Sequence, residues 1–399
     1  MERVSTSVAG EGVPPVGNLE ESAGFFTFVL MSWLDQLFKK GYSRPLELSD
    51  LGEIGKADRS DILHEKFVKE YDIELHKVVA KRSLWGILWR TVGHSRPAIA
   101  IGLFFAASAL QLGPVLILTR LVEYFQGVDT YEKWELWVMV ALLFVFPVIA
   151  SLCLAHSNAI MGHVGVQIRN ILIGAIYRKS LKISPYYKQS ISTGRIITMF
   201  SDDTSQIRDF LFILNNFVVA PFQIGAILYL IYLQVGVATF VGLAYTIFTL
   251  PICAVTFGYV FKLRVIKMKQ TDLRVKLMNE VINGIRIIKY YAWENAFIKK
   301  IAAIRSGELY ITAKMGYIFN AIFGIFLLGA VQIQTVLIFL TYISLGNQLD
   351  AATAFTTLTL FGLMTSPFMG VAFGLQQYNQ SKISMQRIME FLSANDIER

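Results

Sequence analysis

The chain has 399 residues, of which 54% are hydrophobic and only 17% are charged, and its mean hydropathy is +0.50. This composition is too apolar for a soluble globular protein of this length, so we interpret the chain as a membrane protein. We attribute the net charge of +8 to membrane topology and solvated helix faces. A nucleic-acid-binding function is therefore excluded.

The N-terminal region precedes any apolar segment long enough to cross a bilayer. Residues 1–23 are rich in Gly, Ser and Glu and predict a flexible N-terminus without a cleavable signal peptide. Residues 25–37 are aromatic and apolar but too short to span, and Lys39 and Lys40 follow closely. We therefore expect an interfacial helix within an interfacial segment, residues 24–82.

Six later segments each hold about 20 mainly apolar residues, the length that crosses a bilayer. They cover residues 98–121, 137–160, 210–233, 237–261, 315–342 and 351–373. These segments predict a six-helix membrane domain over residues 83–394. An even number of spans places both termini on the same side.

The distribution of Lys and Arg predicts which side that is. These residues fill the loops after the second and fourth segments, whereas Lys133 is the single basic residue in the three opposite loops. Basic loops remain on the cytosolic side. We expect a multi-pass integral protein with both termini in the cytosol, in the plasma membrane or in a vacuolar or endosomal membrane.

Two helices are expected to continue well beyond the lipid. Between residues 137 and 184 the only breaker is Pro147, which falls in the lipid part, where a kink is tolerated. A helix of that length is about 70 Å long, against a hydrocarbon core of about 30 Å. Residues 299–343 contain no Pro and predict a second long helix. We expect two stalks projecting into the cytosol.

The loop between the fourth and fifth segments, residues 278–297, has an amphipathic pattern. Val281, Ile285, Ile288 and Ala292 recur on one stripe of a predicted helix. Charged side chains lie off this stripe: Glu280, Arg286 and Lys289. The pattern predicts a structured element outside the membrane, and a plain solvated connecting helix is the alternative that periodicity leaves open.

The loop after the second segment contains Ser-Thr-Gly-Arg-Ile-Ile-Thr-Met-Phe-Ser-Asp-Asp-Thr, residues 192–204. We expect Ser201 or Asp202 to cap the helix that leads into the third segment. Asp202 and Asp203 have no third ligand at metal-binding spacing, so we interpret them as capping and solvated charges.

These two loops resemble the intracellular loops of the first core membrane domain in ABC transporters of subfamily C, the multidrug-resistance-associated protein family. The segment from Ser32-Trp33-Leu34 to Asp50-Leu51 resembles the lasso of that family, and residues 83–90 resemble its elbow helix. Residues 351–392 resemble its sixth helix and the exit from it. The resemblance covers residues 25–392 and implies an all-α membrane protein with the six-helix fold of a type I ABC exporter.

The resemblance implies that each loop carries a short coupling helix that docks on a nucleotide-binding domain. The residues expected at these two docking sites are Thr193, Gly194, Arg195, Ile196, Gly284, Lys289, Tyr290, Tyr291, Trp293 and Glu294. Residues 395–399 would begin the linker to a nucleotide-binding domain. The expected partners are nucleotide-binding domains and a second transmembrane domain, in a longer chain or in trans, together with the lipid bilayer and a small-molecule substrate.

By this resemblance the chain forms half the substrate pathway of an ATP-driven efflux transporter for organic or amphipathic solutes. ATP and Mg²⁺ would bind to the other domains, because the chain lacks both the G-x-x-x-x-G-K-[ST] phosphate loop and the Leu-Ser-Gly-Gly-Gln signature. We expect no catalytic, cofactor or metal site in this chain. The alternatives are a non-transporting regulator, a channel-type relative, or an inactive truncated fragment.

Polar side chains within the apolar segments are the candidates for substrate contact, because facing lipid is costly for them. Interhelical hydrogen bonding is the alternative role for each. The candidates, with one aromatic residue, are Asn216, Gln223, Asn320, Gln334, Thr357 and Phe361. Residues 98–112 contain no basic residue, so an apolar, aromatic cavity is expected rather than an organic-anion site.

Overall fold

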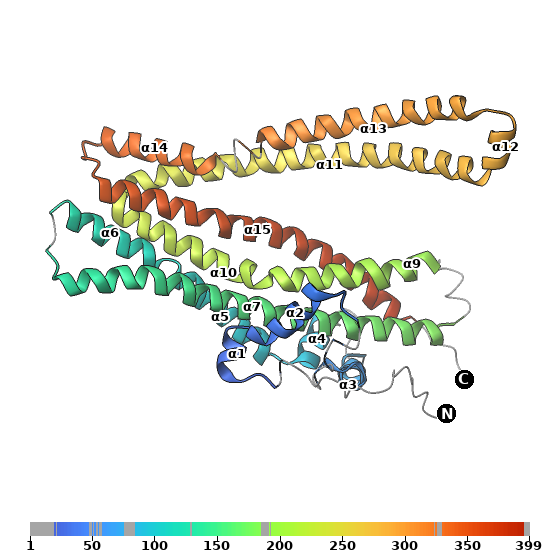
Figure 1. Ribbon diagram of the computed structural model, residues 1–399, viewed down its shortest axis with the longest axis horizontal. Helices are drawn as coiled ribbons and strands as arrows, with labels where there is room; N and C mark the ends of the chain where they lie inside the picture. The colour runs from blue at the N-terminus through green and yellow to red at the C-terminus, as the bar shows by residue number, and fades with distance from the viewer. Residues whose placement is uncertain are drawn as a thin grey trace. The chain divides into compact units, whose positions relative to one another are not determined.

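The computed structural model describes residues 20, 22–47, 50, 52, 55, 58–75, 84–127, 130–184, 191, 193–322, 324 and 329–394. Within these ranges every regular element is a helix (Figure 1), which confirms the all-α prediction. Unit 1 comprises Met1–Ile117, Tyr131–Ile224 and Ser366–Arg399, and unit 2 comprises Leu118–Thr130 and Gly225–Thr365. The predicted N-terminus, residues 1–23, falls outside the description except for residues 20, 22 and 23, and the predicted linker 395–399 falls wholly outside it.

The first apolar stretch of unit 1 is broken into short helices. It forms α1 (Phe25–Val29), η1 (Ser32–Leu34) and α2 (Asp35–Ser43), so the prediction of one helix over residues 25–37 is wrong. Met31 between them adopts the left-handed conformation, with φ of 53°. This turn leaves the Val29 carbonyl available to accept a hydrogen bond of 2.9 Å from Nε2 of His156, whose ring stacks on Phe28. The contact ties α1 to the long helix α7 (Lys133–Lys182).

Two further helices complete the N-terminal part of unit 1. They are α3 (Ser60–Leu75) and α4 (Leu84–Val92), and α4 buries Leu84, Ile87 and Leu88. The Glu74 carboxylate raises the pKa of the Arg90 guanidinium, which also pairs with Glu70 at 2.8 Å. The ion pairs join the exposed side of α4 to α3, while its apolar side enters the core.

The predicted first span, residues 98–121, is interrupted. It consists of α5 (Ser95–Leu110) and α6 (Gly113–Phe125), separated by a turn at residues 111–112. Pro114 has no N–H to donate to the carbonyl of residue 110, and Gly residues weaken a helix, so this is where continuity is lost. Gly113 also packs against α7, because a Cβ there would lie 2.3 Å from the Phe146 ring.

The long second helix is confirmed. α7 extends over 50 residues with Pro147 inside it, which corresponds to about 75 Å at about 1.5 Å per residue. Ser157 of α7 donates a hydrogen bond of 2.7 Å to the Ala100 carbonyl of α5 and accepts one of 2.8 Å from Asn215. These buried bonds connect three apolar helices.

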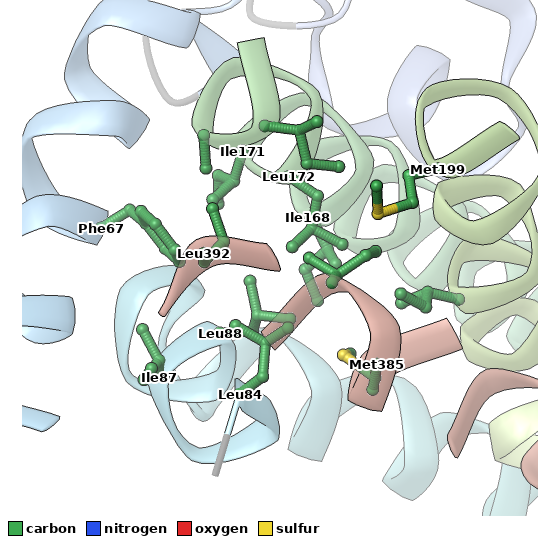
Figure 2. Close-up of a cluster of buried hydrophobic side chains, with 14 of the residues drawn as sticks. Phe67, Leu84, Ile87, Leu88, Ile168, Ile171, Leu172, Met199, Met385 and Leu392 are labelled. Atoms are coloured by element: carbon green, nitrogen blue, oxygen red, sulfur yellow. The ribbon is translucent and has the colours of Figure 1, made fainter. Parts of the chain in front are cut away.

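The remaining helices of unit 1 surround one core. They are α9 (Thr193–Thr198), the π-helix η5 (Met199–Asp203), the first part of α10 (Thr204–Val235) and the end of α15 (Ala351–Leu392). Figure 2 shows buried side chains converging from α3, α4, α7, η5 and α15. The labelled members are Phe67, Leu84, Ile87, Leu88, Ile168, Ile171, Leu172, Met199, Met385 and Leu392.

Unit 2 contains a long antiparallel helix pair joined by a short helix. After the turn of η6 (Gly236–Ala238), α11 (Thr239–Asn283) is followed by α12 (Ile285–Tyr290) and α13 (Glu294–Ile322). Figure 1 shows α12 at the common end of α11 and α13. α13 ends at Ile322 and α14 (Ala330–Ser344) begins after Gly329, and between them only Gly324 and Gly329 are described, so the continuous helix over residues 299–343 remains a prediction.

Glu308 joins α11 to α13 in the middle of this pair. Its side chain is 3% exposed, accepts hydrogen bonds of 2.9 Å from Thr271 and Arg274 of α11, and pairs with Arg305 at 2.8 Å. Hydrogen bonding from Arg305, then Thr271 and Arg274, lowers the pKa of Glu308 to about 2. The carboxylate therefore remains ionised and holds the two helices in register.

Four described helical stretches are long and apolar enough to cross a membrane. They are Ser95–Phe125, Lys133–Lys182, Gly194–Thr249 and Ala351–Leu392, and a shorter apolar helix covers Gln332–Ser344. The third stretch contains all of one predicted span and part of the next. The six-span arrangement of residues 83–394 remains a prediction.

Candidate functional site

The first candidate loop forms a continuous helical path in unit 1. α9 begins at Thr193, Gly194 and Arg195 are exposed, and Ile196 packs half-buried against the core. The predicted N-cap at Ser201 or Asp202 is wrong, because both residues lie inside the π-helix η5. Ser201 donates to the Ile197 carbonyl at 3.0 Å, so its hydroxyl serves the preceding turn rather than a helix terminus.

Asp203 at the end of η5 is buried against the C-terminal part of α15. Its side chain is 5% exposed. Oδ1 accepts a hydrogen bond of 2.8 Å from Ser384 Oγ and lies 3.4 Å from Nη1 of Arg387. The residue is therefore a link between helices rather than the solvated charge that its sequence context suggests.

Two more polar contacts link the C-terminal end of α15 and the residues after it to α9 and α7. Arg195 of α9 pairs with Glu390 at 3.6 Å, and Lys179 of α7 donates to the Ala394 carbonyl. The basic charge of Arg195 thus has an acidic partner within this chain.

The second candidate loop lies at the joined end of α11 and α13. The predicted single stripe through Val281, Ile285, Ile288 and Ala292 is wrong, because these residues belong to three different local structures. α11 ends before Gly284, which is a turn residue, and Ala292 has a left-handed φ of 53°. The chain must reverse here to pair α13 with α11, so one helix cannot continue. Ile288 alone of the four is buried, at 5% exposure.

An aromatic surface covers the outer side of this loop. Tyr290 is 85% exposed, Tyr291 58% and Trp293 51%. Tyr291 stacks on Trp293 with ring centroids 5.1 Å apart and meets Tyr290 edge to face at 5.3 Å. We call these three residues the aromatic tip. So much exposed aromatic surface is typical of a site that binds another protein.

One ion pair braces the aromatic tip. Lys289 Nζ lies 2.8 Å from Glu294 Oε1, and the hydrogen bond that Lys289 donates lowers the pKa of the Glu294 carboxyl. The pair joins the end of α12 to the start of α13, so the aromatic side chains project from a defined turn.

Two of the cavity candidates belong to unit 1. Asn216 of α10 is half-buried beside Gly370 of α15, where a Cβ would lie 2.2 Å from its Oδ1. Gln223 is 8% exposed. Asn216 therefore takes part in helix packing, and a role in substrate contact stays a prediction for both residues.

The other four candidates belong to unit 2 and have different environments. Gln334 donates a hydrogen bond of 2.8 Å to the Gly242 carbonyl. This is interhelical hydrogen bonding, the alternative role considered for each candidate. Phe361 is 1% exposed and Thr357 is 0% exposed, whereas Asn320 is exposed. Only Asn320 presents its side chain to the surface of this unit, and the cavity role of the set remains a prediction.

Sequence reasoning did not identify Asp203 and Glu308 as helix-linking residues. Glu308 stands out in the sequence as an acidic residue among many Lys and Arg residues. Its partner Arg274 is 34 positions away, however, so the sequence does not indicate that the two residues pair. No group of three or more His, Cys, Asp or Glu side chains among the described residues is arranged to hold a metal ion.

The architecture and the two loops define a class of protein. Apolar helices long enough to cross a bilayer, one of which extends to 50 residues, together with a long helix pair that ends in an exposed aromatic turn, define an all-helical membrane domain. The chain belongs to the ABC transporter transmembrane region family, whose model matches residues 98–368. It is the transmembrane part of a transporter of that family and an integral membrane protein with the all-α exporter fold.

Curated relatives confirm the resemblance to subfamily C. The chain is 29% identical over 380 residues to ABC transporter C family member 8 of Dictyostelium discoideum, covering 95% of the chain and 24% of the relative. It is 26% identical over 416 residues to human ATP-binding cassette sub-family C member 3, covering 98% and 27%. ABC transporter C family member 3 of Dictyostelium discoideum is 29% identical over 383 residues, covering 94% and 26%. The chain thus spans about a quarter of the length of these relatives.

Proposed function

We propose that this chain forms half the substrate pathway of an ATP-driven efflux transporter for organic or amphipathic solutes. It associates with a second transmembrane domain and with nucleotide-binding domains that carry ATP and Mg²⁺. Both termini and both candidate loops lie in the cytosol, and α9 and α12 dock on the nucleotide-binding domains. The rigid helices behind each loop transmit the movement of those domains to the membrane.

The observation that carries this proposal is the aromatic tip. Tyr290, Tyr291 and Trp293 sit at the end of an antiparallel helix pair whose longer member, α11, has 45 residues. That length corresponds to about 68 Å, roughly twice a hydrocarbon core. A tip so far along the pair has no role in forming a membrane pore, and its exposed aromatic side chains suit docking on a soluble partner.

The pair itself is built to transmit force. Glu308 connects α13 to Thr271 and Arg274 of α11 at hydrogen-bond distance. A buried charge is costly unless its partners remain in place. Sliding of one helix along the other would break these contacts, so a push on the tip moves both helices together.

A binding test examines the docking step without knowledge of the substrate. The chain is co-expressed with the nucleotide-binding domains of a subfamily C transporter, and co-purification is measured in detergent. Trp293→Ala and Tyr290→Ala should each weaken association about tenfold or more, because central aromatic side chains dominate protein interfaces. Tyr310→Ala is the matched control, because Tyr310 is 71% exposed on α13 and lies outside the tip.

A transport test examines the whole proposal. Inside-out vesicles with the assembled complex are assayed for ATP-dependent uptake of two fluorescent probes, calcein and rhodamine 123. We expect uptake of at least one probe, abolished when ATP is replaced by a non-hydrolysable analogue. Stable association with the nucleotide-binding domains but no ATP-dependent uptake of either probe would contradict the transport function and favour a regulator.

A further inference from the structure

We propose that Asp203 is a positioning residue that fastens the first loop to the C-terminal end of α15, so that the two move as one body during the transport cycle. This inference rests on the function proposed above. We call Asp203, Ser384 and Arg387 the clamp.

The energetic argument starts from the burial of the Asp203 carboxylate. Oδ1 accepts hydrogen bonds from Ser384 and Arg387, and both of these residues belong to α15. Oδ2 is buried and has no hydrogen-bond partner among the described residues. A carboxylate removed from water is tolerated only while its partners stay in place. Separation of η5 from α15 would break both of these hydrogen bonds, so the clamp opposes movement of one segment away from the other.

The local backbone is arranged to present this side chain. Asp203 is the last residue of the π-helix η5, which lies between two α-helical segments, α9 and α10. A π turn holds more residues than an α turn and therefore changes the direction in which the following side chains point; such bulges are frequent at functional sites. Met199, at the other end of η5, enters the same core as Ile388 and Phe391 of α15.

Contacts on both sides of the clamp extend the attachment. Arg195 of α9 pairs with Glu390, and Lys179 of α7 donates to the Ala394 carbonyl. Together with Ser384 they cover the last turns of α15. A displacement received at the exposed α9 is therefore passed directly to α15, in addition to α10, which continues from η5 along the chain.

The test uses a reversible covalent replacement of the clamp. Asp203→Cys and Ser384→Cys are combined in a background in which Cys153 and Cys253 are replaced by Ala, in the complex with nucleotide-binding domains. A short bis-methanethiosulfonate reagent joins the two thiols, and a reductant releases them. The readout is the number of probe molecules taken up per ATP hydrolysed, with calcein and rhodamine 123 as probes.

We expect the reduced double-cysteine variant to transport about tenfold less probe per ATP than the parent, in the range of typical coupling free energies between sites. Cross-linking should restore the ratio, because the covalent link replaces the polar one. Ser201→Cys with Ser205→Cys is the matched control: Ser201 is exposed in η5, Ser205 is half-buried at the start of α10, and Ser205 Oγ donates a hydrogen bond to the Ser201 carbonyl. Cross-linking this pair should leave the ratio unchanged.

Two variants of Arg387 distinguish a positioning role of the clamp from a role in folding alone. Arg387→Lys retains a cation near Asp203 and should keep most of the coupling, whereas Arg387→Gln should lose it. A wild-type ratio in the reduced double-cysteine variant, or a cross-link that blocks uptake, overturns the inference. Equal ratios for the two Arg387 variants also overturn it. Absence of ATP-dependent uptake by the parent complex refutes the proposed function itself, and the inference falls with it.

Discussion

The glycines of α15 lead to a prediction with an internal control. Gly370 and Gly374 are buried against α10, where an added Cβ would lie 2.2 Å from Asn216 Oδ1 and 2.4 Å from Phe217 Cδ2, respectively. Gly362 in the same helix has no atom within 4 Å of the position of an added Cβ. Small residues four positions apart allow two membrane helices to approach closely.

The expected magnitudes follow from these distances. An extra methyl group in a packed site costs about 1–3 kcal/mol, whereas replacing Gly by Ala in a helix gains about 1 kcal/mol. At Gly374 the clash includes Phe217 Cβ at 2.7 Å, which cannot move without the backbone, so the packing cost should be about 2–3 kcal/mol. After the helix gain of about 1 kcal/mol, Gly374→Ala should destabilise by about 1–2 kcal/mol. At Gly370 the clash is with the end of the Asn216 side chain, which can rotate, so the loss should be smaller.

The assay is thermal unfolding in detergent, which is monitored by the loss of the monodisperse peak in size-exclusion chromatography. We expect Gly374→Ala to lower the melting temperature by about 2–5 °C and Gly362→Ala to leave it unchanged or raise it. Adding Phe217→Ala should recover part of the loss in Gly374→Ala, because it removes the atoms that clash. The reasoning is refuted when Gly374→Ala melts at or above the temperature of Gly362→Ala.

Three further predictions concern other contacts. The pKa of Glu308 is lowered from 4.5 to about 2, so its contribution to stability is present above about pH 4.5 and is lost as the pH falls towards 2. Glu308→Gln should therefore lower the melting temperature at pH 7 and remove this part of its pH dependence. A pH profile of the melting temperature that is the same in the variant and the parent would contradict this. Gln334→Leu should cost about 1 kcal/mol, because it removes the hydrogen bonds from Gln334 to the Gly242 carbonyl and to Thr246 Oγ1, each worth about 0.6 kcal/mol on average in a membrane. Gln332→Leu is the control in the same melting assay. Phe391→Ala should cost about 3–5 kcal/mol because the side chain is 1% exposed, and urea titration of the purified protein should show a correspondingly lower midpoint.

Long-range patterns in the sequence were sufficient for the class of protein. Hydropathy identified the apolar helices, and the absence of any breaker except Pro147 predicted the length of α7, which the structure confirms at 50 residues. The motifs of the two loops indicate subfamily C, in agreement with the curated relatives. Hydropathy is informative here because bilayer thickness and helix rise require about 20 mainly apolar residues in every helix that crosses the membrane.

The positions at which helices are interrupted were predicted poorly. The interruption before Gly113 and the turn at Met31 both fall within stretches where the apolar pattern continues. Periodicity reports which faces are apolar, but it does not report where the chain must reverse to bring two helices together. At Ala292 a left-handed backbone is adopted for that reason, although Ala does not favour it.

The sequence by itself determined that this is an all-helical membrane domain of the ABC transporter type, because hydrophobic length and loop motifs are properties of the chain alone. Only the tertiary structure decided what individual polar residues do. Asp203 and Ser384 are 181 positions apart, and Glu308 and Arg274 are 34 apart. A charge that would be solvated in an isolated helix becomes a link between helices once folding removes the water around it, and that removal depends on which helices pack together.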